Sequence, residues 1–446
     1  MSFEIIHLGA EQEVTGSCHY LNLNDTHILI DCGLAQGNAR KKNMSHWPVH
    51  PSKIDYLLIT HAHIDHIGRI PELIRKGFEG EILTSHATKA LMTPMLENAM
   101  ALGSQDKRER KKMLARIEDL TWGFEFNESF RLKKKISFTL GRAGHILGSC
   151  FIQIKTKDIS IVFSGDLGST NTPILCDPDI PEPCDYLCLE STYGDRNHDN
   201  RKDRIQKLGE VLTRALSDQG KVYIPSFSLG RTQELIFEMD RIFSDPEFKK
   251  QFSEISTLKR VPVFLDSPLG VNITRLFSKL SKYWDKEALQ LKKKGDHPID
   301  FQYLYAVENY RQHQKLLEMP GPAIIIAGSG MCTGGRILNH LETGLPDWRN
   351  DILFVGYQAS GTLGKEIMRF GKRTGGYVYI DNNRIDIKAN IHNMTGYSAH
   401  ADQKGLINWV DAIKEKPGKI KLIHGEPDAQ NELRKKLIEK QYSVVH

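Results

Sequence analysis

The sequence contains one short stretch whose residue types point to metal chemistry. Residues 60–67 are Thr-His-Ala-His-Ile-Asp-His-Ile, so that His61, His63, Asp65 and His66 fall within six positions. Imidazole nitrogens and carboxylate oxygens are ligands that zinc accepts, and a catalytic zinc site keeps one position for water. A loop with this sequence can aim His61 and His63 at one cation and Asp65 and His66 at a second. The alternative, a polar loop in solvent, explains the clustering poorly.

The flanking residues indicate how this stretch is held. Residues 55–59 form an apolar run typical of a buried strand, and residues 71–74 have the pattern of a helix. We therefore expect the cluster on a loop that leads from a strand into a helix.

Three further candidate ligands stand at the ends of predicted strands or beside glycines. His145 lies between Gly144 and Gly148, which leave the nearby backbone unobstructed for a metal. Asp166 comes just after an apolar strand, and His424 ends another. Each residue is a weak signal alone, but together they supply the ligands that a dinuclear site still needs.

Asp31 follows the predicted strand 26–30 and has two interpretations. It could accept a hydrogen bond from a ligand histidine and orient its ring, as carboxylates near metal sites do. It could equally cap a turn.

The order of these residues along the chain resembles that of the metallo-β-lactamase superfamily. Within it, the chain resembles the β-CASP branch, which processes nucleic acids, because three further segments look like motifs A, B and C of that branch: residues 189–196, 398–402 and 423–426. A histidine at motif C resembles the RNA-acting members. The chain is similar to short bacterial and archaeal relatives of the endonuclease subunit of the cleavage and polyadenylation specificity factor.

The resemblance implies an α/β fold, with a metallo-β-lactamase αββα sandwich and an inserted β-CASP domain made of a parallel sheet flanked by helices. We expect residues 1–206 and 372–446 to form the metallo-β-lactamase domain and residues 207–371 to form the β-CASP domain. Strand and helix signals alternate from residue 221 to residue 357, which independently favours parallel βαβ units.

The resemblance also implies the roles of the site residues. The implied ligands of two Zn2+ ions are His61, His63 and His145 for one, Asp65, His66 and His424 for the other, and Asp166 for both. A hydroxide between the metals would attack the phosphodiester, and Asp65 would accept the proton of the water. His400, held by Glu190, would donate a proton to the leaving oxygen, because a carboxylate partner raises the pKa of an imidazole.

Glycine-rich loops in the central segment suggest contacts with RNA phosphates. Ser329 lies in one such loop, and Arg231, Arg336 and Lys365 lie in or beside these loops. Backbone amides in the loops could form an anion cradle, or the glycines could simply allow tight turns. Surface salt bridges are the alternative for the three basic residues.

The function implied is a zinc-dependent ribonuclease that hydrolyses single-stranded RNA, with endonucleolytic cleavage as the expected mode. Two alternatives remain: a small-molecule metallo-hydrolase acting on a thioester, lactam or phosphonate, and a non-catalytic RNA-binding scaffold. An inserted domain of roughly 165 residues is more than a small substrate needs, and every ligand position is filled.

Composition sets broad bounds on these interpretations. The 446 residues suggest two large domains, and 60 Lys+Arg against 55 Asp+Glu give a charge of +5, which permits a polyanionic substrate. Seven scattered cysteines without a CxxC pair predict reduced thiols and a cytoplasmic protein. No apolar stretch approaches the roughly 20 residues of a membrane span, so no membrane partner is expected. A homodimer is compatible with the sequence.

Overall fold

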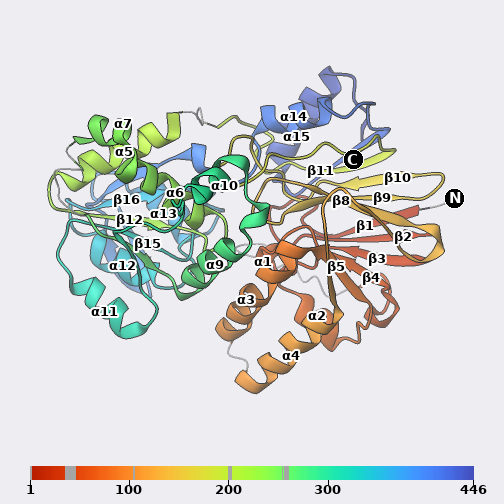
Figure 1. The fold of residues 1–446 in the computed structure, drawn as a ribbon, viewed down its shortest axis with the longest axis horizontal. Coiled ribbons are helices and arrows are strands. Elements are labelled where there is room, and N and C mark those ends of the chain that lie inside the picture. The colour runs from red at the N-terminus through yellow and green to blue at the C-terminus, as the bar shows by residue number, and fades with distance from the viewer. Residues whose placement is uncertain are drawn as a thin grey trace. The chain divides into compact units, whose positions relative to one another are not determined.

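The computed structural model describes residues 3–35, 47–103, 106–198, 203–253, 255 and 261–445. The chain divides into two compact units, one made of residues 1–197 and 400–446 and the other of residues 198–399. Figure 1 shows the elements of both. None of the helices in these described ranges is both long and apolar enough to cross a membrane.

The first unit begins with a six-stranded sheet whose strands lie side by side in chain order. These strands are β1 (Phe3–Gly9), β2 (Cys18–Leu23), β3 (Thr26–Ile30), β4 (Tyr56–Leu58), β5 (Glu81–Ser85) and β6 (Thr121–Phe124). The pairs from β1 to β3 are antiparallel and those from β3 to β6 are parallel. The connecting helices are α1 (Ile64–Ile67), α2 (Ile70–Arg75), α3 (His86–Leu102) and α4 (Lys107–Leu120).

The second sheet of this unit has seven strands, in the order β21-β20-β11-β10-β9-β8-β7. Their bounds are β7 (Ser129–Arg131), β8 (Ser137–Arg142), β9 (Cys150–Lys155), β10 (Ser160–Phe163), β11 (Tyr186–Glu190), β20 (Lys419–Ile423) and β21 (Val444–Val445). Strand β20 pairs in parallel with β11, so that Glu190 lies opposite Ile423. The end of the chain therefore returns to the edge where the earlier site residues emerge.

Apolar residues that alternate along both sheets form the core between them. Leu21, Ile28 and Leu83 from the first sheet meet Ile152 and Phe163 from the second in one buried cluster. Helices α14 (Gln403–Asp411) and α15 (Pro427–Glu439) cover the other face of the second sheet, burying Leu406, Trp409 and Leu433, among others (Figure 1). The layers helix, sheet, sheet and helix confirm the αββα sandwich.

The second unit is built on a fully parallel six-stranded sheet, ordered β14-β13-β15-β12-β16-β19. The strands are β12 (Lys221–Pro225), β13 (Val263–Asp266), β14 (Leu304–Ala306), β15 (Ala323–Ala327), β16 (Asp351–Phe354) and β19 (Asn390–Asn393). Strand β15, Ala-Ile-Ile-Ile-Ala, is buried along its whole length, as expected of a parallel strand covered on both faces.

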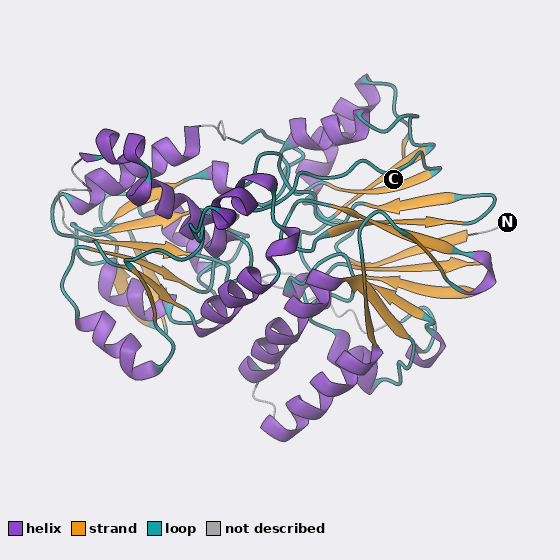
Figure 2. Cartoon of the chain, viewed as in Figure 1, coloured by secondary structure: helices purple, strands orange, loops and turns teal. Residues whose placement is uncertain are grey.

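Helices lie on both sides of this sheet (Figure 2). They are α5 (Arg204–Leu216), α6 (Arg231–Ser244), α7 (Pro246–Gln251), α9 (Pro268–Lys279), α10 (Lys286–Lys293), α11 (Tyr310–Glu318), α12 (Ile337–Gly344) and α13 (Leu363–Phe370). A hairpin of β17 (Tyr377–Ile380) and β18 (Asn383–Asp386) completes the unit.

The unit boundaries differ from those expected at residues 206/207 and 371/372. They fall at 197/198 and 399/400. The second difference has a clear cause, because β19 pairs with β16 of the parallel sheet and the core around Ile367 also contains Val378 and Ile380. Residues 372–399 therefore belong to the inserted unit.

Candidate metal centre

The candidate ligands in the first unit lie on loops that follow its strands. The 60–67 stretch leaves β4, and its backbone turns into α1 at Ile64. Gly33 packs against it so closely that a Cβ atom there would lie 1.6 Å from the carbonyl oxygen of Asp65. The backbone of residues 17–34 is hydrogen-bonded to the stretch, with Cys32 N donating to His66 O at 2.7 Å. The loop is thus fixed by neighbouring backbone.

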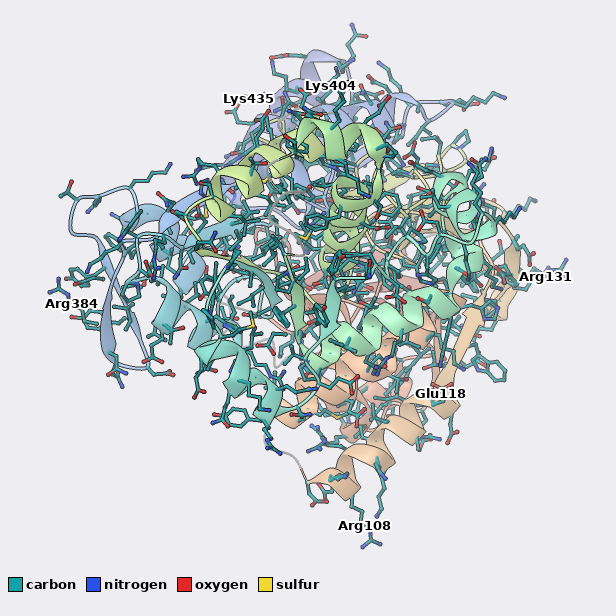
Figure 3. The ribbon with its side chains drawn as sticks, turned by 60° about the vertical axis from the view of Figure 1, so that its left-hand side comes forward. Arg108, Glu118, Arg131, Arg384, Lys404 and Lys435 are labelled. Atoms are coloured by element: carbon teal, nitrogen blue, oxygen red, sulfur yellow. The ribbon has the colours of Figure 1, made fainter. Side chains whose placement is uncertain are left out.

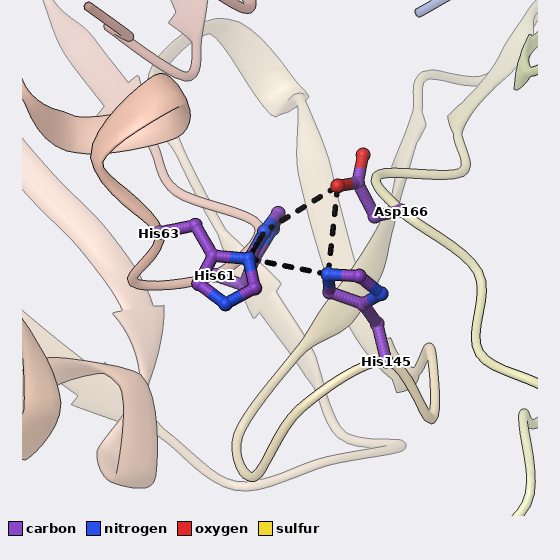
Figure 4. A group of neighbouring side chains, drawn as sticks. All are labelled: His61, His63, His145 and Asp166. Carbon is purple, nitrogen blue, oxygen red and sulfur yellow. Dashed lines mark hydrogen bonds and ion pairs between the residues drawn. The ribbon is translucent and has the colours of Figure 1, made fainter. Parts of the chain in front are cut away.

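One group of ligand atoms comes from His61, His63, His145 and Asp166 (Figure 4). His63 Nδ1 lies 3.1 Å from His61 Nε2 and 3.2 Å from His145 Nε2. Asp166 Oδ2 lies 3.5 Å from His61 Nε2 and 3.6 Å from His145 Nε2. A tetrahedral zinc ion with bonds of about 2.0–2.1 Å separates its ligands by roughly 3.3 Å, so these four atoms have the spacing of a zinc site.

A second group comes from Asp65, His66 and His424. Asp65 Oδ2 lies 4.0 Å from His66 Nε2 and 3.9 Å from His424 Nε2. Asp166 reaches this group as well, because its Oδ2 lies 3.4 Å from His66 Nε2. Asp166 is therefore placed between the two groups, as a bridging carboxylate would be.

Unsatisfied polar atoms support a cation at this place. Within the described part of the chain, His66 Nε2, His424 Nε2 and Asp166 Oδ1 are buried without a hydrogen-bond partner. Buried polar groups without partners are rare and costly unless an ion or water completes them. The donor set, with imidazoles and carboxylates only, fits zinc.

The pKa shifts of the candidate ligand histidines differ. At His66, burial acts to lower the pKa, but Asp166 and Asp31 outweigh it and raise the pKa well above the usual value. Burial keeps two of the others in the form that binds metal. It lowers the pKa of His61 and His145 well below the usual value, so their rings are neutral and offer a lone pair. Burial acts to raise the pKa of Asp166, but the neighbouring His424, His66 and His61 outweigh it and hold the pKa well below the usual range. Asp166 is thus ionised.

Asp31 lies behind the second group. Its Oδ2 is 2.7 Å from His66 Nδ1, and it accepts hydrogen bonds from the Thr60 amide and the Thr60 hydroxyl, both at 2.8 Å. These contacts favour orientation of His66 over capping of a turn. The sequence does not predict this role of Thr60. Thr60 stands next to His61, but no pattern in the chain links it to Asp31.

His400 and Glu190 lie together beside the candidate metal ligands. His400 Nδ1 is 3.1 Å from Glu190 Oε1, and its Nε2 is 4.0 Å from Asp166 Oδ2. Glu190 also accepts hydrogen bonds from the amides of Leu167 and Thr192. Burial lowers the pKa of His400, but the carboxylates of Glu190, Asp166 and Asp65 together raise it more, so the net shift is upward. The His400 side chain remains 17% exposed, so a substrate can reach it.

The four predicted RNA-contact residues lie in the second unit, in different environments. Arg231 is only 5% exposed and pairs with Glu234. Arg336 donates to Asp266 Oδ1 at 2.7 Å and to the Val307 carbonyl at 2.8 Å. A phosphate would have to replace these partners. Lys365 is exposed, and Ser329 and Arg336 are at intermediate positions.

Hydrogen bonds within residues 328–336 account for several amides of that loop. Ser329 N donates to Gly334 O, Cys332 N to Ser329 O, and Thr333 N to the Ser329 hydroxyl. The glycines therefore serve a compact turn, which was one of the two interpretations of this segment.

The structure contains a second histidine cluster, in which Asp266 meets His313 and His340, that sequence reasoning does not find. Its residues come from three separate segments, so no spacing pattern marks it. Asp266 Oδ2 lies 2.5 Å from His313 Nδ1 and 2.6 Å from His340 Nε2, and Arg336 occupies the other carboxylate oxygen. These distances are those of direct hydrogen bonds, shorter than the 3.1–3.6 Å of the first group, and the arginine disfavours a cation.

Comparison with known protein families matches most of the chain. Residues 12–226 match the metallo-beta-lactamase superfamily, residues 232–367 a Beta-Casp domain, and residues 384–446 a Zn-dependent metallo-hydrolase RNA specificity domain. The fold and this site therefore define a metallo-hydrolase. The chain belongs to the β-CASP family of the metallo-β-lactamase superfamily, which confirms the resemblance drawn from the motifs.

Several individual proteins are similar over nearly the whole chain. Ribonuclease TTHA0252 of Thermus thermophilus is 35% identical over 430 residues, which cover 95% of this chain and 93% of that protein. Transcription termination factor FttA of Methanocaldococcus jannaschii is 30% identical, and the match covers 94% of this chain and 66% of the archaeal protein. Endoribonuclease YSH1 of Candida glabrata is 27% identical, with 98% and 56% covered. The chain thus spans less than two thirds of the length of the last two relatives.

A solved structure shares the fold. The crystal structure of a protein of unknown function from Enterococcus faecalis V583 aligns with a TM-score of 0.54 at 14% identity, covering 99% of this chain and 96% of that one.

Proposed function

We propose that this protein is a zinc-dependent ribonuclease that hydrolyses phosphodiester bonds of single-stranded RNA. The observation that carries the proposal is the pair of ligand groups that share Asp166, with His400 and Glu190 beside them. The printed names of the relatives from Thermus thermophilus and Candida glabrata, a ribonuclease and an endoribonuclease, support RNA as the substrate.

In this proposal some side chains bind the metal ions and others transfer protons. His61, His63 and His145 would hold one zinc ion; Asp65, His66 and His424 would hold the other; Asp166 would contact both. Two bound zinc ions would lower the pKa of water and screen the phosphodiester charge. Asp65, whose side chain is partly exposed, accepts the proton of the attacking water.

His400 then supplies the proton that the leaving oxygen needs. Glu190 accepts a hydrogen bond from His400 Nδ1 and so directs Nε2 toward the side of Asp166. The upward pKa shift of His400 keeps a proton on the ring near neutral pH, which is the condition for general acid catalysis.

Ser329 and Lys365 are the better candidates for contacts with RNA phosphates. Both are more accessible than Arg231, and within the described residues neither pairs with a carboxylate as Arg336 does. We assign Arg231 and Arg336 a structural part, in which each neutralises a buried acidic residue.

Three further parts of the proposal are zinc as the metal in the cell, a cytoplasmic location and a homodimer. The seven cysteines are all free thiols, six of them buried, which suits a reducing compartment. Light scattering of the purified protein tests the dimer.

The experiment is cleavage of end-labelled single-stranded RNA by zinc-loaded protein, compared with an Asp65→Ala, His66→Ala double variant. Cleavage by the wild type alone supports the proposal, and internal products indicate an endonuclease. If the wild type binds two zinc ions but cuts no RNA, while it hydrolyses a thioester, the small-molecule alternative replaces the proposal.

A further inference from the structure

The β17–β18 hairpin of the second unit has one buried face and one exposed face. Val378 and Ile380 point into a core cluster, and Ile385 packs against it. Tyr377 and Tyr379, two residues apart on β17, are 40% and 59% exposed. Two large aromatic rings on the outer face of one short strand leave apolar surface that the fold itself does not cover.

An arginine side chain lies against one of these rings. The Arg384 guanidinium stands over the Tyr377 ring, 4.1 Å from its centroid. Its ion pair with Asp386 is formed at 3.2 Å between two side chains that are more than half exposed, and such pairs contribute little. Arg384 can therefore exchange this partner for a phosphate at low cost while it stays stacked on the ring.

Helix α13 adds cations to the same region. Arg369 and Arg373 lie 5.4 Å and 5.2 Å from the Phe370 ring, at the end of that helix and just beyond it. Gly376 N donates to Arg373 O, which ties this turn to the start of β17. Figure 3 shows Arg384 projecting outward from the hairpin.

The charge of this segment is biased toward a polyanion. The exposed basic residues between 365 and 388 are Lys365, Arg369, Lys372, Arg373, Arg384 and Lys388, against three acidic residues, Glu366, Asp381 and Asp386. The basic run on α4 differs in two ways. Residues 107–120 contain no aromatic side chain, and four acidic residues lie in or next to this helix: Asp106, Glu109, Glu118 and Asp119. Of these two segments, only the hairpin segment combines cations with exposed rings.

We propose that the hairpin surface, defined as Tyr377, Tyr379, Arg384, Arg369 and Arg373, is a stacking platform for single-stranded RNA. This inference rests on the proposed function and adds a place where the substrate strand is held. Bases stack on the tyrosine rings, and the arginines contact the phosphates that link those bases. This combination of aromatic stacking with a positive surface binds single strands with little sequence preference.

The test measures binding of a fluorescent 20-nucleotide single-stranded RNA to zinc-loaded protein in a His400→Ala background, which keeps the RNA intact. The Tyr377→Ala, Tyr379→Ala double variant should raise the dissociation constant about 10-fold or more, because the stacking of each base on an aromatic ring contributes substantially to the binding free energy. Tyr377→Phe, Tyr379→Phe keeps both rings and should bind like the parent. Tyr310→Ala, which removes a tyrosine that is 65% exposed on α11, is the matched control and should have no effect.

A second readout addresses the arginines. The RNA-binding constant falls as the salt concentration rises. Replacing Arg384 and Arg373 with glutamine should make the slope of log K against log salt less negative by about 0.7 for each lost phosphate contact. Thermal unfolding of each variant shows that the hairpin still folds.

The outcomes separate this inference from the proposed function. If the wild-type protein cleaves RNA but the tyrosine variant binds as tightly as its parent, the platform is wrong and the nuclease stands. If binding depends on the tyrosines but the wild type cuts no RNA, the platform stands and the nuclease is wrong. A variant that changes the protein from dimer to monomer without changing RNA affinity assigns the surface to self-association and overturns the inference, as does a wild type that binds no RNA.

Discussion

Asp31 Oδ2 lies 2.7 Å from His66 Nδ1, so a buried carboxylate fixes the orientation of one candidate metal-binding ring. Asp31→Asn would place an amide where the carboxylate oxygen accepts the ring proton. We expect the affinity for one of the two zinc ions to fall by 10- to 100-fold, as is usual for such partners of ligand histidines. Titration against a chromophoric chelator measures both affinities, and Asp158→Asn, at an exposed turn, serves as the control. If Asp31→Asn leaves both zinc affinities unchanged, Asp31 does not orient a ligand and serves as a turn cap.

The pair of His400 and Glu190 gives a prediction about the leaving group. His400→Asn should lower kcat on RNA by about 100- to 10,000-fold with the zinc content unchanged, because a proton donor is lost. Glu190→Gln should have a smaller effect in the same direction. A substrate with a p-nitrophenolate leaving group needs no protonation, so the loss should largely disappear when bis(p-nitrophenyl) phosphate replaces RNA. Equal losses on both substrates would contradict the role of His400 as an acid.

Gly33 gives a prediction about the backbone that supports the metal site. A Cβ atom at this position would lie 1.6 Å from Asp65 O and 2.8 Å from Ser17 N. Gly33→Ala must therefore displace the loop with Asp65 and His66, and we expect loss of zinc measured by mass spectrometry together with a lower unfolding temperature. At Gly103 the nearest atom would be 3.5 Å away, so Gly103→Ala is the control. Full zinc content in Gly33→Ala would show that the loop can shift without harm.

Asp240 on α6 gives a prediction about pH and stability. Burial raises the pKa of Asp240 from 3.8 to about 6. The folded state holds the proton of Asp240 more tightly than the unfolded chain does. Protonated Asp240 therefore stabilises the folded state below about pH 4, and this contribution to the free energy of unfolding is lost as the pH rises through 6. Asp240→Asn removes the buried charge and should stabilise the protein at pH 8 by about 1 kcal/mol, after allowance for solvent screening, or about 2–4 °C in the unfolding temperature of this unit.

Calorimetry at two pH values checks this prediction. At pH 5 the wild-type carboxyl group is mostly protonated, so the advantage of the asparagine variant should shrink. A gain at pH 5 as large as the gain at pH 8 would mean that the charge of Asp240 is not the cause.

The sequence predicts that the candidate ligands lie close together, because their positions are local to strand ends. The 60–67 stretch, Asp166 and His424 each follow a strand with a strong apolar signal, and parallel pairing carries such ends to one edge of a sheet. The structure accordingly brings all seven predicted ligands into two adjoining groups.

Features set by tertiary pairing were harder to predict. Nothing in the sequence of β19 shows that it pairs with β16, so the sequence does not predict that the second unit extends to residue 399. Arg231 has the appearance of an exposed cation after a glycine, yet its partner Glu234 and its burial depend on how α6 packs. The contact of Asp266 with two distant histidines is of the same kind.

Because residues 400–446 return to the first unit, the order of synthesis limits when the proposed centre can form. His400 and His424 both lie in residues 400–446, and β20 must pair with β11 before His424 reaches its neighbours. A ribosome that has made residues 1–399 has made neither histidine. The proposed centre therefore cannot form before residues 400–424 have been made, and a growing chain that stops short of them lacks two of its histidines.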